Sequence, residues 1–372
     1  MSAPDILVIG GGIAGLSAAA ALSAHARVTV LEAEEQIGFH SSGRSATMLH
    51  YALGDRLIRA LTLASRPFFD DPPDGFDAVC HRMPVLVHAR EEERDVLEAL
   101  YADIAPFAEL ERLDAAGVHG LCPLLRDNAR HGIADLDGLR LHPHALLQGN
   151  LRQLRSRGCE LRTGMRIGRI DRDGGAGWTV TSESGERFSA PVLVNAAGAW
   201  ADRIAELVGV KPLGLEPKRR TIITFEAPAG TRLEGLPFTK TVGDELYFAP
   251  ESGRLFASPM DEVPSDPCDA QPDEYEVALA AYRMEERTTV QVRQIHSKWA
   301  GLRTFTPDKH PAAGFAPDAE GFFWLAGQGG FGLQTSPAMA AITASLILGQ
   351  SWPISDVAAE ALSPARFTAQ HA

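Results

Sequence analysis

Apolar and polar positions at the start of the chain alternate between two kinds of segment. Residues 6–9 (ILVI) form a continuous apolar run, a glycine-bearing turn follows, and an alanine-rich segment leads to a second apolar run at residues 28–31. Short continuous apolar runs are typical of strands buried on both faces, and a longer alanine-rich segment favours a helix. The pattern therefore predicts a buried strand–helix–strand unit.

Two later segments repeat the change from strand to turn. Residues 190–201 (APVLVNAAGAWA) read as a β-branched strand that ends in residues almost without side chains. Residues 321–348 read as a strand, a glycine-rich turn and a helix, with Thr335 or Ser336 expected as the helix cap and Pro337 in the first turn. Both segments are places where backbone can approach a bulky ligand closely.

Length and charge narrow the class of protein. A chain of 372 residues usually forms more than one core, so we expect two domains. The formal charge of −13, with the basic residues scattered, argues against a nucleic-acid partner. Four cysteines without a Cys-x-x-Cys spacing favour reduced thiols over a disulfide framework or a metal site. We expect a cytoplasmic protein without membrane insertion, and a surface loop at the acidic, proline-rich residues 261–274.

The first turn carries a dinucleotide-binding fingerprint. Gly10, Gly12 and Gly15 fit G-x-G-x-x-G between the strand and the helix, and Glu32 ends the second strand. In this pattern the glycines allow a tight turn, close approach to a pyrophosphate and close helix packing, and the acid accepts hydrogen bonds from a ribose. The free N–H groups of the helix N-terminus favour phosphate. The sequence therefore predicts a dinucleotide cofactor.

The C-terminal strand, turn and helix favour FAD over NAD. A second helix terminus suits a flavin ring, because its positive dipole end stabilises the anion of the reduced flavin. The sequence has no second complete G-x-G-x-x-G unit for a nicotinamide nucleotide. We therefore expect an organic substrate to supply the electrons, and an NAD(P)H-dependent flavin monooxygenase is kept as a less favoured alternative.

With these segments in order, the chain resembles the D-amino-acid oxidase superfamily, and within it the bacterial D-arginine dehydrogenases. The motifs that carry the resemblance are GFHSSGRSA, LVNAAGAWAD, GLEPKRRT, KWAGLRTF and GFFWLAGQGGFGLQTS. The resemblance implies an α/β fold: a Rossmann-like FAD domain (residues 1–77, 138–209 and 299–372) and a smaller α+β substrate domain with a mainly antiparallel sheet (residues 78–137 and 210–298).

Family motifs also place residues on the cofactor. The loop at residues 41–46 would wrap the flavin, with Arg44 as a donor to the pyrophosphate. The full expected set is Gly10, Gly12, Ile13, Ala14, Gly15, Glu32, Ala33, Ser41, Ser42, Arg44, Ser45, Ala46, Ala196, Ala197, Gly198, Trp200, Gly301, Arg303, Gly327, Gly329, Gly330, Phe331, Gly332, Leu333, Gln334 and Thr335. Gly301 falls near the place where sarcosine oxidases carry a flavin-linking cysteine, so we expect noncovalent FAD.

Substrate contacts follow from the same resemblance. Oxidation of an amino acid needs an anchor for its carboxylate, and Arg303 is the best candidate because a guanidinium binds a carboxylate bidentately. The other expected site residues are Arg220, Tyr247, Gly330 (through its carbonyl), Leu333, Met48 and His50. No metal is expected.

Some positions depart from the D-arginine dehydrogenases. Pro84 stands where they hold the substrate guanidinium with a glutamate, and Met48 stands where they have a histidine. Lys240 falls near a position where they have a small apolar pocket residue. We therefore expect FAD-dependent oxidation of a neutral or acidic amino or imino acid, favouring the D form, with O₂ or a quinone-like carrier as electron acceptor. The alternatives are a 2-hydroxy-acid dehydrogenase using His50 as base, a secondary-amine dehydrogenase, and a flavin-bound module without turnover.

Overall fold

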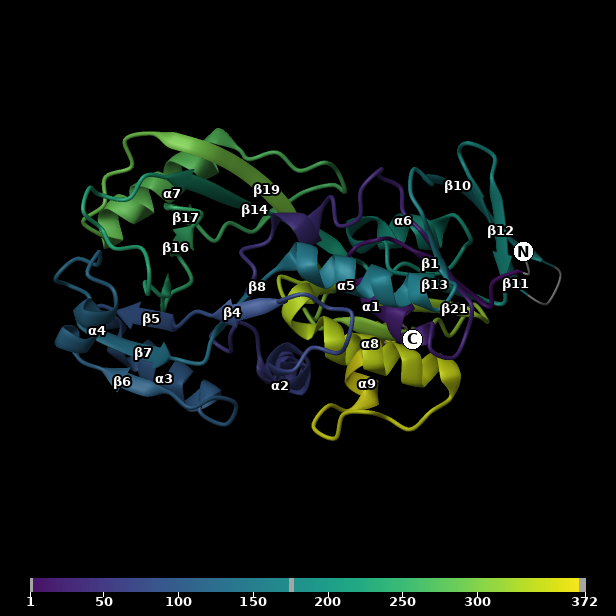
Figure 1. Cartoon of the computed structure of the whole chain (residues 1–372), viewed down its shortest axis with the longest axis horizontal. Helices are drawn as coiled ribbons and strands as arrows, with labels where there is room; N and C mark the ends of the chain where they lie inside the picture. Colours follow the sequence, from purple (N-terminus) through teal and green to yellow (C-terminus); the bar gives the residue numbers. More distant parts are fainter. Residues whose placement is uncertain (1–2, 174–176, 368–372) are drawn as a thin grey trace.

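A computed structural model describes residues 3–173 and 177–367. Residues 1–2, 174–176 and 368–372, which the predicted cofactor domain includes, lie outside the described residues. The chain forms two lobes side by side (Figure 1). One lobe is built on a six-stranded sheet and the other on a ten-stranded sheet. The predicted α/β fold class is confirmed, and both of its sheet types are present.

The six-stranded sheet has the order β20-β21-β13-β1-β2-β9. All neighbouring pairs are parallel except β20 with β21. Because β1 and β2 are buried along their whole length, their sequences are continuous apolar runs. The strands are β1 Ile6–Ile9, β2 Val28–Leu31, β9 Glu160–Arg162, β13 Val192–Asn195, β20 Ala312–Phe315 and β21 Phe322–Ala326.

Helices pack against this sheet and against one another. The central helix α1 (Ile13–Leu22) contacts both α5 (Pro143–Ser156) and α8 (Gly332–Leu348), and α2 (Arg56–Asp70) lies on α8. Since α1 is buried between the sheet and these helices, small and apolar residues occupy all of its positions. The short helices α6 (Ala201–Glu206) and α9 (Ala359–Leu362) complete this lobe, with a three-stranded sheet of β10 Ile167–Asp173, β11 Gly177–Ser182 and β12 Arg187–Ala190.

The start of α8 differs from the sequence-based expectation. The helix begins at Gly332, and neither Thr335 nor Ser336 caps it. Pro337 lies inside the helix instead of in its first turn. The Ser336 hydroxyl donates a hydrogen bond to the carbonyl of Leu333 (2.9 Å), the acceptor that a proline cannot serve. This hydroxyl therefore compensates for the missing N–H group.

The larger sheet runs β22-β19-β14-β17-β16-β15-β5-β7-β6, with β18 paired to β14. Its pairs are antiparallel except β5 with β15, as expected of the substrate domain. Its strands are β5 Val85–Ala89, β6 Glu111–Leu113, β7 His131–Asp135, β14 Glu216–Phe225, β15 Phe238–Thr241, β16 Tyr247–Glu251, β17 Arg254–Ser258, β18 Val263–Pro264, β19 Ile295–Phe305 and β22 Gln328–Gly329. Helices α3 (Arg94–Ile104) and α4 (Ala115–Leu121) pack on the β5–β7 end, and α7 (Glu274–Arg287) packs on β14 and β17.

One predicted domain boundary cuts through a strand. The boundary at residues 298/299 falls inside β19, which pairs with β14 on both sides of that point. The whole of β19 therefore belongs with the larger sheet. A small fourth sheet joins the lobes, with β8 (Leu139–Leu141) between β3 (Met48–Leu49) and β4 (Cys80–Arg82).

The segment predicted as a surface loop, residues 261–274, is only partly exposed. Asp261 is buried and accepts hydrogen bonds from the backbone N–H and the hydroxyl of Thr221 (2.7 and 3.0 Å). Ala270 is also buried, and its carbonyl accepts a hydrogen bond from Arg44. These contacts tie the segment to both lobes, which composition alone does not reveal.

Candidate active site

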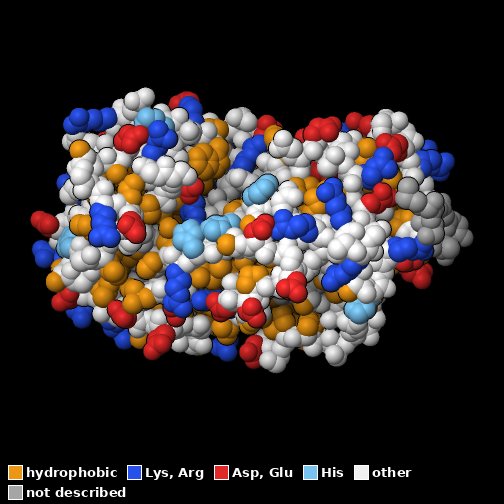
Figure 2. Space-filling model, in the orientation of Figure 1, with side chains coloured by type: hydrophobic (Ala, Val, Ile, Leu, Met, Phe, Trp, Pro, Cys, Tyr) orange, Lys and Arg blue, Asp and Glu red, His pale blue; other side chains and the backbone are white. Residues whose placement is uncertain are grey.

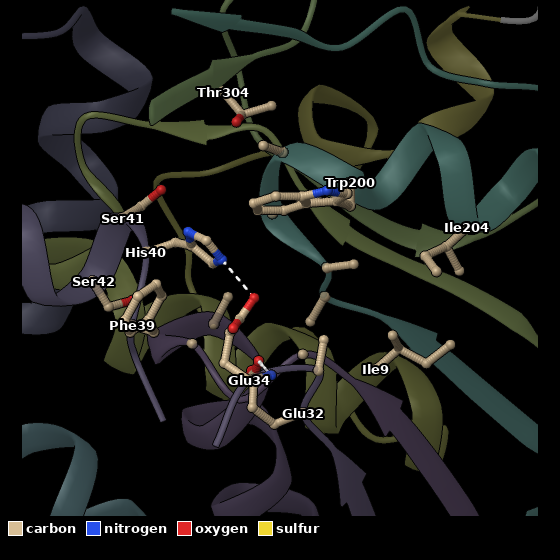
Figure 3. A pocket seen from close by; sticks show the side chains of 18 of the residues that line it. Ile9, Glu32, Glu34, Phe39, His40, Ser41, Ser42, Trp200, Ile204 and Thr304 are labelled. Carbon is tan, nitrogen blue, oxygen red and sulfur yellow. Dashed lines mark hydrogen bonds and ion pairs between the residues drawn. The ribbon is translucent and has the colours of Figure 1, made fainter. Parts of the chain in front are cut away.

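A cavity of about 440 Å³, here called the cofactor cavity, lies where the predicted dinucleotide fingerprint meets the other lobe. Figure 3 shows Trp200 and His40 on one side of it and Glu32 and Ile9 on the other. The predicted cofactor residues that line it are Gly10, Gly12, Ile13, Ala14, Glu32, Ala33, Ser41, Ser42, Ala196, Ala197, Gly198, Trp200, Gly329 and Gly332. Segments far apart in sequence therefore meet around one space.

Glycine is required at positions 10 and 12 of the fingerprint for two different structural reasons. Gly10 has a φ of +113°, and a Cβ there would lie 2.3 Å from the carbonyl oxygen of Ala196. Gly12 has ordinary backbone, and a Cβ there would meet only the Ser42 hydroxyl, at 3.4 Å. Since Gly12 lines the cavity at the start of α1, a side chain there would occupy space beside the helix N-terminus. This cradle fits the diphosphate of a dinucleotide.

Glu32 holds the two turns that frame the cavity. Its carboxylate accepts hydrogen bonds from the backbone N–H groups of Gly11 (2.5 Å) and Glu34 (2.8 Å). Burial raises the pKa of this carboxyl above its ordinary value, while the two N–H groups oppose that shift. Each carboxylate oxygen keeps a lone pair beyond these bonds, so the residue can still accept a hydrogen bond from a ribose.

The loop at residues 41–46 binds mainly to protein. The Ser42 hydroxyl accepts a hydrogen bond from the backbone N–H of Ile13 (3.0 Å), and the Ser41 hydroxyl donates one to the carbonyl of Leu302 (2.6 Å). The Ser45 hydroxyl accepts one from the N–H of Thr47 (3.2 Å). The loop thus fastens the start of α1 to β19.

Arg44 is placed differently from the sequence-based expectation. Its guanidinium donates to the carbonyls of Ala270 (3.0 Å) and Ala300 (3.3 Å) and pairs with Asp269 (2.6 Å). The residue does not line the cofactor cavity. Because its donors face carbonyls and a carboxylate, the geometry gives Arg44 a structural role between the lobes and not the expected contact with the pyrophosphate.

His40 and Glu34 are among the cavity residues that were not singled out from the sequence. His40 packs its ring on Trp200, with centroids 4.5 Å apart, and its Nε2 lies 3.1 Å from the carboxylate of Glu34 (Figure 3). Both residues line the cofactor cavity. The available signal was the position of His40 at the head of the serine-rich loop, directly before Ser41.

A second, smaller cavity continues from the first. This inner cavity has a volume of about 70 Å³, and Ile13, Ser41, Ser42, Leu302, Gly329 and Gly332 line both spaces. Of the predicted substrate residues, it is lined by Arg220, Tyr247, Arg303, Gly330 and Leu333. Gly301, Arg44, Ser45 and Ala46 also line it. The structure therefore brings most of the predicted substrate residues together at one end of the cofactor cavity.

Strand register explains why Arg220 and Arg303 meet. Arg220 on β14 lies opposite Gly301 on β19, and Arg303 is two residues further along the same face of β19. Such diagonal neighbours are within reach of long side chains. Burial and the positive charge of Arg220 lower the pKa of Arg303 to about 10, so the guanidinium remains a cation at neutral pH.

Several polar atoms around the inner cavity have no partner among the described residues. Arg220 donates to the carbonyl of Asp261 (2.7 Å) and pairs with Glu262 (3.2 Å), but its Nη1 is buried without a partner. The Tyr247 hydroxyl is also buried without a partner. In the described chain the side chain of Arg303 has no hydrogen-bond or ion-pair partner. Since buried polar groups are normally satisfied, these donors indicate a site for an anion.

His50 and Met48 do not line the cofactor cavity or the inner cavity. His50 Nδ1 accepts a hydrogen bond from the N–H of Ala52 (3.2 Å), and its ring packs on Phe238. Burial, with the nearby charges of Lys240 and Arg303, lowers the pKa of His50 to about 3. A base so weak cannot take a proton efficiently at neutral pH. This geometry argues against the hydroxy-acid alternative.

Lys240 is neither on the surface nor in the lining of these cavities. Its ammonium pairs with Asp244 and donates to the carbonyl of Thr241 (3.0 Å). Burial lowers its pKa, and the Asp244 carboxylate opposes the shift. The buried lysine therefore forms a structural ion pair with Asp244.

The C-terminal turn contributes fewer lining residues than predicted. Gln334 bonds to the Thr62 hydroxyl (2.7 Å), and Thr335 bonds to the carbonyl of Phe331 (2.9 Å). These contacts are internal to the α2–α8 packing. Gly15, Gly327, Phe331, Gln334 and Thr335 line neither cavity.

Within residues 3–173 and 177–367, no group of His, Cys, Asp and Glu is arranged to hold a metal ion. No helix in the same ranges is long and apolar enough to cross a bilayer.

Comparison with known proteins decides the family. Residues 5–346 match the model of the DAO family, described as FAD dependent oxidoreductase. The chain belongs to this family. Its cofactor is FAD, which the glycine cradle and the cavity beside α1 fit.

Relatives in this family differ in what they act on. The chain is 27% identical to a glycine oxidase of Bacillus licheniformis, over 99% of this chain and 98% of that protein. It is 26% identical to FAD-dependent oxidoreductase domain-containing protein 1 of Bos taurus, over 92% of this chain and 81% of that protein. The chain spans only 62% of the length of hydrogen cyanide synthase subunit HcnC of Pseudomonas aeruginosa, to which it is 24% identical.

The fold is shared with a solved L-proline dehydrogenase from P. horikoshii. The two superpose with a TM-score of 0.85 at 21% identity, covering 99% of this chain and 98% of the other. The superfamily resemblance seen in the sequence is confirmed by the family match. The finer resemblance to D-arginine dehydrogenases stays a prediction.

Proposed function

We propose that the protein oxidises the Cα–N bond of an amino or imino acid, with a preference for D-amino acids, and produces an imine that hydrolyses to a 2-oxo acid. The observation that carries this proposal is the unpaired Arg303 in the inner cavity. Bound FAD supplies the hydride acceptor, and the described chain supplies the groups that hold the substrate.

Charge around the inner cavity favours a single carboxylate. Arg220 is already balanced by Glu262 at 3.2 Å, whereas Arg303 has no carboxylate partner in the described chain. One substrate carboxylate would restore neutrality and accept hydrogen bonds from Arg303 and from the Tyr247 hydroxyl. A guanidinium binds such a group bidentately and fixes its orientation. This binding would aim the α-carbon at the neighbouring cofactor cavity.

The amine end of the substrate would lie near Gly330. Gly330 lines the inner cavity beside Arg303, and a Cβ there would lie 3.2 Å from the guanidinium carbon. The absence of a side chain therefore leaves room for the substrate next to its anchor. A backbone carbonyl here would accept a hydrogen bond from the substrate nitrogen, as in the resembled family, and Leu333 would form an apolar wall.

Noncovalent FAD is part of the proposal. Gly301 falls near the position where sarcosine oxidases have a linking cysteine, and the four cysteines of this chain are absent from the lining of the cofactor and inner cavities. Acid precipitation should therefore leave the flavin in solution. Flavin that stays with the precipitated chain would contradict this part.

The main test is anaerobic reduction of the bound flavin by a panel of compounds. Glycine, both enantiomers of alanine, leucine, proline and glutamate, and the matching 2-hydroxy acids are compared by loss of visible flavin absorbance. We expect reduction by amino or imino acids, faster with D forms, and none by hydroxy acids. Rapid reduction by NADPH alone would establish the monooxygenase instead. No reduction by any compound would support the flavin-bound module. Reoxidation by O₂ or by a quinone then identifies the electron acceptor.

A further inference from the structure

The inner cavity is too small for a large substrate. Its volume of about 70 Å³ is much smaller than the 440 Å³ of the cofactor cavity. A carboxylate held by Arg303 and its α-carbon would take most of that space. Any longer substituent on the α-carbon must therefore extend elsewhere.

A much larger cavity begins directly beyond the inner one. This outer chamber has a volume of about 880 Å³, and Ser45, Ala46 and Ile222 line both spaces. Figure 2 shows the molecule hollowed between its lobes, with histidines gathered beside the hollow over β4 and the start of α5. A substituent that leaves the inner cavity past Ala46 and Ile222 would enter this chamber.

The backbone between the two cavities is held firmly. Arg140 donates a hydrogen bond to the carbonyl of Ala46 (2.7 Å), and the N–H of Leu141 donates to the carbonyl of Thr47 (2.7 Å). Thr47 itself has a φ of +60°, a conformation that non-glycine residues adopt only when their surroundings fix it. The backbone at the boundary between the two cavities is therefore held in one conformation.

Charged groups of the outer chamber are already neutralised. Arg140 pairs with Glu251 and lies 4.9 Å from the ring of Phe256, and Arg82 pairs with Asp137. The exposed Glu234, which also lines the chamber, pairs with Arg232 (3.6 Å). His81 and His142 bond to each other at 2.8 Å. Apolar side chains complete the lining, among them Met83, Pro84, Leu233 and Leu236. The chamber thus offers apolar surface without an unpaired charge deep inside it.

From these observations we infer that the substrate is an amino acid with an extended, uncharged side chain, which passes Ala46 and Ile222 and ends in the outer chamber. The inference rests on the proposed function. It names the substrate class that the same site takes.

A chain-length series on the holoenzyme tests the inference. Glycine, alanine, norvaline, norleucine and 2-aminooctanoate, each in the faster enantiomer, are compared by kcat/KM for anaerobic flavin reduction. We expect kcat/KM to rise about three- to fourfold for each added CH₂ beyond norvaline, as burial of a CH₂ is worth about 0.8 kcal/mol. A maximum at glycine or alanine, with a fall to norleucine, would overturn the inference and leave the proposed function standing. Failure of the whole series to reduce flavin would overturn both.

A matched pair of variants tests the chamber itself. Leu233 is half-buried and lines the outer chamber but not the inner cavity. Leu233→Glu adds a carboxylate to the apolar wall, and Leu233→Gln adds the same shape without charge. We expect the ratio of kcat/KM for norleucine to that for alanine to be about tenfold lower in Leu233→Glu than in Leu233→Gln. Equal ratios in two variants with normal flavin content would show that the side chain ends elsewhere.

Discussion

Arg303 and Arg220 lie diagonally across β19 and β14 on the same face of the larger sheet. Of these two arginines, only Arg220 has a carboxylate partner among the described residues. Two like charges placed together in a buried site raise the free energy of the cationic forms, as the lowered pKa of Arg303 reflects. A bound carboxylate lowers the free energy of these cationic forms. The two arginines together therefore favour the binding of an anionic group.

Replacing Arg303 should abolish most of that binding. We expect Arg303→Met to lower kcat/KM by about 30-fold to several thousand-fold, since losing a charge-assisted pair in a dehydrated site costs about 2–5 kcal/mol. The matched control is Arg219→Met on the same β14 strand, because Arg219 lines neither the cofactor cavity nor the inner cavity. Rates of flavin reduction are compared at equal flavin content. Equal losses in the two variants would refute the anchor role.

The two fingerprint glycines should respond differently to alanine. In Gly10→Ala the new methyl group would meet a backbone carbonyl, so we expect a lower Tm and loss of FAD. In Gly12→Ala the nearest atom is a hydroxyl at ordinary contact distance, so the fold should persist while FAD affinity falls at least tenfold. Titration of FAD into the flavin-free variants and their Tm values measure this. Wild-type FAD affinity in Gly12→Ala would mean that the diphosphate lies elsewhere.

Pro84 lines the outer chamber, where an extended substrate side chain is proposed to end. A long cationic side chain there lacks a free counter-charge, so D-arginine and D-lysine should be poor substrates of the wild type. We expect Pro84→Glu to raise kcat/KM for D-arginine about tenfold over Pro84→Gln, which matches it in shape. If D-arginine leads the wild-type panel, another carboxylate completes the site.

Asp135 should make stability depend on pH. Burial raises the pKa of this carboxyl from its ordinary value of 3.8 to about 6 in the folded protein. The folded state binds this proton more tightly than the unfolded state does. The contribution of protonated Asp135 to the free energy of unfolding is therefore full below pH 4 and is lost as the pH rises through about 6. Asp135→Asn should therefore gain about 1–3 kcal/mol over wild type at pH 7.5 and little at pH 4.5. Urea unfolding with excess FAD at both pH values measures this, and an equal difference at both would contradict it.

What the sequence determined was local. The order of apolar runs and Gly10, Gly12 and Gly15 predicted β1, α1 and β2, because strand burial and tight turns depend on neighbouring residues. The motifs also predicted FAD and the family. Prediction was weakest at α8, where a hydroxyl on Ser336 lets Pro337 lie inside the helix.

Only the tertiary structure decided which charged groups are free. Arg44, Arg220 and Arg303 all resemble anion-binding residues in sequence, yet Asp269 pairs with the first and Glu262 with the second. Those partners come from residues distant in sequence, so no local pattern could reveal them. Long-range packing also buries Lys240, whose partner Asp244 is only four residues away, and keeps His50 neutral. Solvation and ion pairing depend on every element packed around a group, and this is why the fold decided the site.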